Sequence, residues 1–145
     1  MFNDAAARQS TVPAAEEQIR LAAAALLFHV IAVDGVVTED ERATLKELLA
    51  RRFGLDPEAA AALARQAQDA EAEAVDLFTF THVLKAALEL EDRVRIIEMM
   101  WQLVYADGSI HEFEDNAVWR VAELLGVPSE TRIRLKQTVR ERVRS

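Results

Sequence analysis

Residues 32–41 read Ala-Val-Asp-Gly-Val-Val-Thr-Glu-Asp-Glu, and residues 105–114 repeat the pattern as Tyr-Ala-Asp-Gly-Ser-Ile-His-Glu-Phe-Glu. In each copy an aliphatic residue stands two positions past the glycine, and a glutamate stands seven positions past the aspartate. A long apolar segment precedes each copy and an amphipathic segment follows it. Glycine often ends a helix because it adopts the left-handed conformation of a C-terminal cap at little steric cost. Each copy therefore predicts a corner between two helices.

The rest of the chain also favours helices. It holds only 4 Gly and 3 Pro in 145 residues, and its apolar residues recur at helical spacing without strand-like alternation. We expect an all-α fold, with a loose N-terminal arm at residues 1–13 and a single domain at residues 14–145. About seven helices are predicted, near residues 14–33, 39–53, 57–72, 76 or 79 to 88, 92–105, 112–125 and from 129 onward. Two helix-corner-helix units packed about a pseudo-two-fold axis would bury their apolar faces together.

The composition excludes some kinds of functional site and disfavours others. Cysteine is absent, which excludes disulfides, thiol nucleophiles and Cys-ligated zinc. The net charge of -8 argues against nucleic-acid binding, because phosphate neutralisation needs clustered Lys and Arg. Basic residues do gather after Val127, where they suit an anionic membrane surface, an acidic partner or simply a solvated helix face.

No segment indicates export or membrane insertion. The first residues lack the basic and apolar regions of a signal peptide. The longest apolar run, residues 21–33, is interrupted by His29 and is shorter than the roughly 20 residues of a membrane span. We expect a cytoplasmic protein without a transmembrane segment, with peripheral association with the inner membrane as a variant of this prediction. The sequence leaves the oligomeric state open.

The acidic corners are the candidate metal site. A carboxylate at the end of a helix faces the negative potential of the last carbonyls, so a cation there is stabilising. If the corners meet, their carboxylates suit Ca²⁺, Mg²⁺ or Mn²⁺, and an imidazole shifts the preference towards Zn²⁺. The candidate ligands are Asp34, Glu41, Asp107, Glu114 and His111. The spacing matches half of an EF-hand loop, but the positions of the first two ligands hold no carboxylate in either copy, which excludes a standard EF-hand.

A metal-free alternative explains the same residues. Thr38 and Glu41 have the spacing of a capping box, and each corner aspartate can accept hydrogen bonds from its own turn. His111 replaces the threonine in the second copy, so this explanation covers Glu114 less well. Of the other histidines, His29 and His82 are expected at hydrogen-bonded core or boundary positions.

Aromatic residues and catalytic motifs add two expectations. The residues predicted to be buried in the core are Phe28, Phe78, Trp101, Phe113 and Trp119. The chain has no nucleophile elbow, phosphate loop, dinucleotide fingerprint or zinc-protease motif. We therefore expect a non-enzymatic protein, and a metal-dependent hydrolase is the least favoured class.

The sequence resembles TerB-like domains of bacterial tellurite-resistance proteins. The resemblance lies in both corners and in two further stretches, Leu-Phe-Thr-Phe-Thr at residues 77–81 and Arg-Ile-Ile-Glu-Met-Met-Trp at residues 95–101. Such a domain also occurs at the N-terminus of a membrane-anchored DnaJ-type co-chaperone. The resemblance spans residues 15–143. It implies an all-helical fold with a pseudo-two-fold arrangement and an acidic divalent-metal site. The positions that match are Asp34, Glu41, Asp107 and Glu114, whereas His111 and the basic tail have no counterpart.

The resemblance also implies a kind of cellular function. Family members are linked to tellurite and other stress responses and to membrane-associated complexes with other proteins. We therefore expect a bacterial stress-associated domain that binds a divalent metal and acts through protein partners. The alternative is a metal-free interaction module whose corners only cap helices and form turns.

Overall fold

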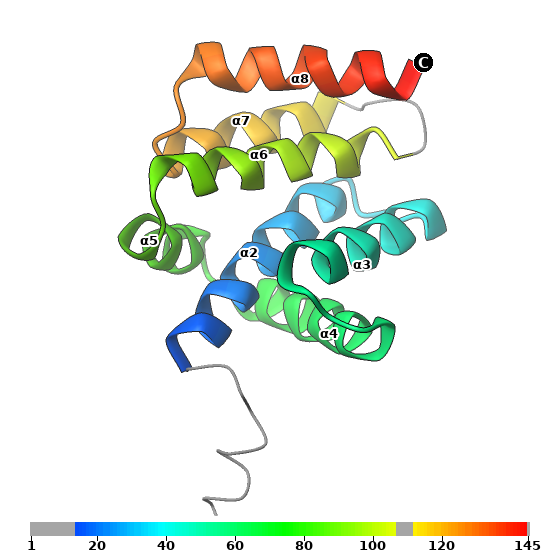
Figure 1. The fold of residues 1–145 in the computed structure, drawn as a ribbon, viewed down its shortest axis with the longest axis vertical. Helices are drawn as coiled ribbons and strands as arrows, with labels where there is room; N and C mark the ends of the chain where they lie inside the picture. Colours follow the sequence, from blue (N-terminus) through cyan, green and yellow to red (C-terminus); the bar gives the residue numbers. More distant parts are fainter. Residues whose placement is uncertain (1–13, 107–111, 145) are drawn as a thin grey trace, which may run out of the picture.

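The chain is all-helical in its computed structural model, which describes residues 14–106 and 112–144 (Figure 1). Within these ranges there are seven helices and no strand, as the sequence predicted. The helices are α2 (Ala14–Ala32), α3 (Glu39–Phe53), α4 (Pro57–Glu73), α5 (Phe78–Ala87), α6 (Leu90–Val104), α7 (Glu112–Leu124) and α8 (Ser129–Arg144). The predicted N-terminal arm, residues 1–13, lies outside the described residues.

Helix α2 is the centre of the domain. Its residues 22–28, together with Val30 and Ile31, are buried, so the helix is apolar on all sides after its first two turns, which are polar and partly exposed. Such a helix is stable only when other elements surround it. It contacts α3, α4, α5, α6 and α7, and Figure 1 shows it between α4 at one end of the molecule and α6 and α7 towards the other.

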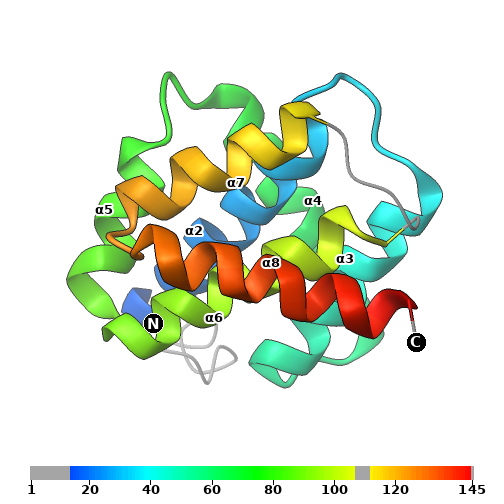
Figure 2. The same ribbon diagram turned by 90° about the horizontal axis from the view of Figure 1, so that it is seen from above.

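Two helices close the ends of the molecule. Helix α4 packs along α2, and its Ala60 and Ala67 are buried, as are the alanines at residues 22–25 of α2. Helix α8 lies across α6 and α7 (Figures 1 and 2), where the carbonyl of Arg132 accepts a hydrogen bond from Trp101 Nε1–H at 3.2 Å. Trp101 is fully buried, so α8 is part of the core structure.

Local sequence signals set most helix ends. Thr38 caps α3, Asp56 caps α4 by accepting a hydrogen bond from the Ala59 N–H at 2.7 Å, and Gly54 ends α3 with φ of 65°. One boundary differs from the prediction. Helix α6 begins at Leu90 and not near residue 92, because the carbonyl of Glu89 already accepts the first helical hydrogen bond from Arg93 N–H.

The helix ends that flank the two corners lie towards one side of the molecule. In both views α2 and α6 end, and α3 and α7 begin, towards the right-hand side (Figures 1 and 2). Helices α2, α3, α6 and α7 also share contacts, as expected for two helix-corner-helix units packed together. The pseudo-two-fold relation between the units stays a prediction.

Burial of α2 yields a stability prediction. Ala24 is 0% exposed, so Ala24→Leu should lower the free energy of unfolding by about 1–3 kcal/mol, because added methylenes force the packed neighbours apart. Ala43→Leu on the exposed surface of α3 is the control and should change it by less than about 0.5 kcal/mol. Urea unfolding followed by circular dichroism measures both. Equal effects at the two positions would contradict the central place of α2.

Candidate functional site

The first corner is a tight turn followed by a capped helix. Gly35 adopts φ of 83°, and its N–H donates to the carbonyl of Ala32 at 3.0 Å. Asp34 Oδ1 accepts a hydrogen bond from the Val36 N–H at 3.0 Å. The turn thus needs the glycine for its left-handed backbone and the aspartate for its side-chain acceptor.

The capping box predicted from Thr38 and Glu41 is present. Thr38 Oγ1 accepts from the Glu41 N–H at 3.0 Å, and Glu41 Oε1 accepts from the Thr38 N–H at 2.9 Å. Together these bonds satisfy two backbone donors at the start of α3. Glu41 as a residue is nevertheless only 3% exposed. A capping glutamate on a helix surface does not need to be buried in this way.

The second corner repeats the position of this glutamate. Helix α6 ends at Val104, and the N–H of Ala106 donates to the carbonyl of Leu103 at 3.1 Å. Glu114 is the third residue of α7, as Glu41 is the third residue of α3, and it is 1% exposed. Asp107 and His111, the other predicted ligands of this corner, lie outside the described residues. The structure therefore places Asp34, Glu41 and Glu114 of the five predicted ligands.

Those three residues do not form a ready-made metal centre by themselves. Across residues 14–106 and 112–144, no group of three or more His, Asp or Glu side chains is arranged to hold an ion. The donor chemistry still fits a hard cation, since a carboxylate has two oxygens and can accept a backbone N–H with one while binding an ion with the other. Asp34 and Glu41 can therefore cap a turn or helix and contribute to a cation site at once.

An apolar groove adjoins both corners, and the sequence did not predict it. It has a volume of about 540 Å³ and runs between the end of α2, the segment that joins α4 to α5, and α7. Its lining, called here the α7 groove, consists of His29, Val33, Val75, Asp76, Leu77, Phe78, Phe113, Asn116, Ala117, Arg120 and Leu124. Val33 belongs to the first corner and Phe113 to the second, so the groove contacts one residue of each corner.

Three of the five aromatic residues predicted to lie in the core are exposed in the structure. Phe28 and Trp101 are buried as predicted, but Phe78, Phe113 and Trp119 are exposed, at 61%, 66% and 47%. Their helical spacing signalled an apolar face but could not show that no other element covers it. Val75 is fully exposed beside Phe78, so large apolar side chains gather at this rim.

The other histidines have separate surroundings. His29 Nδ1 lies 3.0 Å from Glu71 Oε2 at a half-buried position, which confirms the predicted hydrogen-bonded boundary residue. His82 is exposed, and its ring stacks on Phe78 at 5.4 Å between centroids. The prediction of a core or boundary position for His82 was therefore wrong, because α5 turns this residue to solvent.

The basic tail is partly neutralised by its own domain. Lys136 Nζ lies 2.9 Å from Asp115 Oδ1 and 5.4 Å from the centre of the Trp101 ring. Arg142 Nη1 lies 3.1 Å from Glu98 Oε2. These contacts dock α8 on α6 and α7, so two of the predicted surface cations have structural partners. None of the helices described by the structure is long and apolar enough to span a membrane.

The fold and the corners define a class: an all-helical domain with two acidic helix-corner-helix motifs and a buried glutamate in each. Comparison with protein families gives the same result, since the family described as tellurite resistance protein TerB matches residues 20–137. The chain belongs to the TerB family. No curated protein and no solved structure matches the chain.

Proposed function

We propose that this TerB-family domain binds a divalent cation at its paired corners and acts through protein partners in a bacterial stress response. The observation that carries the proposal is the matched pair of buried carboxylates, Glu41 and Glu114, at the same position of two helices. In this proposal the domain works by binding and not by catalysis. It acts in the cytoplasm, alone or beside a membrane-associated complex.

Burial of two carboxylates is the physical argument for a cation. A charged side chain loses hydration free energy when it is buried, so buried Asp and Glu are stabilised by donors or cations. The first turn of a helix offers N–H donors and the positive end of the helix dipole, which offset part of this cost. A divalent cation between the corners would offset more, with Asp34, Glu41 and Glu114, and by the sequence pattern Asp107 and His111, as its ligands.

The α7 groove supports the partner half of the proposal. Exposed large apolar residues that gather on one surface mark interaction sites more often than scattered ones do. Here they include Val75, Phe78 and Phe113. Arg120 and Asp76 also line the groove and would orient a partner's polar groups around its apolar contacts.

A second candidate is the metal-free interaction module. It is favoured by the hydrogen bonds of the first corner, where Asp34 and Glu41 already serve the turn and the cap. In this candidate the groove alone carries the function, and added cations leave the stability unchanged.

Glutamine substitutions separate capping from cation binding. Gln can replace Glu in a capping box but lacks the charge, so Glu41→Gln with Glu114→Gln should abolish any stabilisation by a cation. Wild-type protein in saturating Ca²⁺, Mg²⁺, Mn²⁺ or Zn²⁺ should melt about 5–10 °C higher than in chelator with at least one of these ions, and the double variant should show no rise. Differential scanning calorimetry measures both.

Thr38→Ala is the matched control for this experiment. It removes the cap and should cost about 1 kcal/mol of stability, yet keep the cation-dependent rise. If no ion raises the wild-type melting temperature, the cation proposal fails and the metal-free module stands. An equal rise in wild type and double variant would place the ion elsewhere.

The groove generates a second prediction. Val75→Ser with Phe113→Ser should reduce capture of bound proteins from bacterial lysate at least about tenfold, because two exposed apolar anchors are lost. Ile133→Ser on α8, which is 44% exposed and outside the groove, is the control and should keep the captured proteins. Quantitative mass spectrometry compares the three samples. The same captured proteins from the double variant as from wild type would contradict the groove as the partner site.

A further inference from the structure

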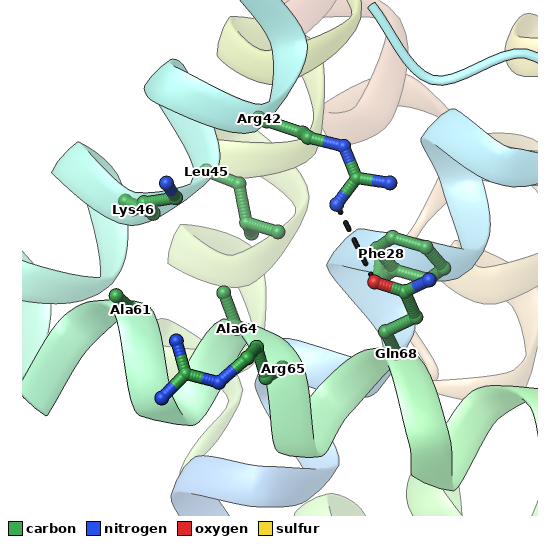
Figure 3. Close-up of a pocket in the computed structure, with 8 residues that line it drawn as sticks. All are labelled: Phe28, Arg42, Leu45, Lys46, Ala61, Ala64, Arg65 and Gln68. Carbon is green, nitrogen blue, oxygen red and sulfur yellow. Dashed lines mark hydrogen bonds between the residues drawn. The ribbon is translucent and has the colours of Figure 1, made fainter. Parts of the chain in front are cut away.

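A second cavity, which shares no lining residue with the α7 groove, lies between α3 and α4. Its volume is about 210 Å³, and its apolar wall is formed by Phe28, Leu45, Ala61 and Ala64. Figure 3 shows the two helices facing each other across it, with Phe28 of α2 behind. For comparison, an engineered apolar cavity of about 150 Å³ holds a benzene molecule. The space is therefore large enough for a ring or a short apolar chain.

The polar side chains of this cavity are all donors or amides. Arg42 and Lys46 project from α3, Arg65 projects from α4, and Gln68 completes the lining, which contains no carboxylate (Figure 3). Arg42 Nη1 lies 3.4 Å from Gln68 Oε1, a contact that holds the guanidinium on the cavity side of α3. Three cationic residues from two helices thus line this cavity.

The three cations of this cavity have no acidic partner among the residues that the structure describes. The chain has 25 acidic residues and a net charge of -8, yet none of the three forms an ion pair with any residue in the described part of the chain. Arg42 and Lys46 are also four residues apart on one helix, where like charges repel. An anion between them and Arg65 would remove this repulsion and accept charge-assisted hydrogen bonds.

We propose that this cavity binds a small organic anion, with its carboxylate or phosphate among Arg42, Lys46 and Arg65 and its apolar part against Phe28 and Leu45. The two anionic groups share the same chemistry, since both match the planar fork of Arg and the point charge of Lys. None of the residues that line the cavity is a proposed cation ligand, so anion binding and cation binding can be tested separately.

NMR titration of the ¹⁵N-labelled protein tests the proposal. Phenyl phosphate and benzoate are the probes, and the tighter of the two identifies the preferred anionic group. Either should shift the resonances of Ala61, Ala64 and Arg65. Inorganic phosphate lacks the apolar part and benzyl alcohol lacks the charge, so each should bind at least about tenfold more weakly than the better probe.

Variants locate the binding. Arg65→Gln should weaken the better probe about tenfold, the loss of one charge-assisted contact, and Ala64→Leu should block the cavity. Arg51→Gln is the matched control: Arg51 lies on α3, its side chain is 68% exposed and it is outside the lining, so binding should stay within about twofold. The proposal is overturned if neither probe binds, if Arg51→Gln weakens binding as much as Arg65→Gln, or if Ala64→Leu leaves it unchanged.

Discussion

Burial of α2 on all sides is the constraint on which the structure depends. From Ala22 to Ile31 this helix has no polar face, so it gains stability only when all sides of that segment leave water, and five other helices contact α2. It packs on α4, α5, α6 and α7, and its alanines and larger apolar residues are buried there. Because α2 must then leave the core abruptly, the turn at Gly35 and the cap at Thr38 direct the chain into α3. The first acidic corner is thus a consequence of how the central helix ends.

The sequence predicted the features that depend on local chemistry. Caps, glycine stops and helical periodicity predicted all seven helices within a few residues, and the doubled motif predicted that Glu41 and Glu114 occupy matched positions, whereas their burial is seen only in the structure. It did not predict which apolar faces stay uncovered, because periodicity identifies an apolar face without identifying what packs on it. Helix α7 shows this well: Val118 and Val121 are buried, whereas Phe113, with the same apolar character, borders the groove.

The two halves of the proposed function meet at the corners. Glu41 and Glu114 lie in the first turns of α3 and α7, and the groove residues Val33 and Phe113 adjoin Asp34 and Glu114 in the chain. A cation held between the corners would fix the starts of both helices and with them one edge of the groove. Cation binding and partner binding are then thermodynamically linked, so each strengthens the other. Capping does not compete with this role, because each carboxylate has a second oxygen.

Equilibrium dialysis followed by elemental analysis tests the cation claim most directly. The wild-type protein and the Glu41→Gln/Glu114→Gln variant are dialysed together against Ca²⁺, Mg²⁺, Mn²⁺ or Zn²⁺, and the metal in each protein compartment is compared with the buffer outside. The account predicts a stoichiometric excess of at least one of these ions with the wild type and none of that ion with the variant. No excess with any ion, or the same excess with both proteins, would contradict it.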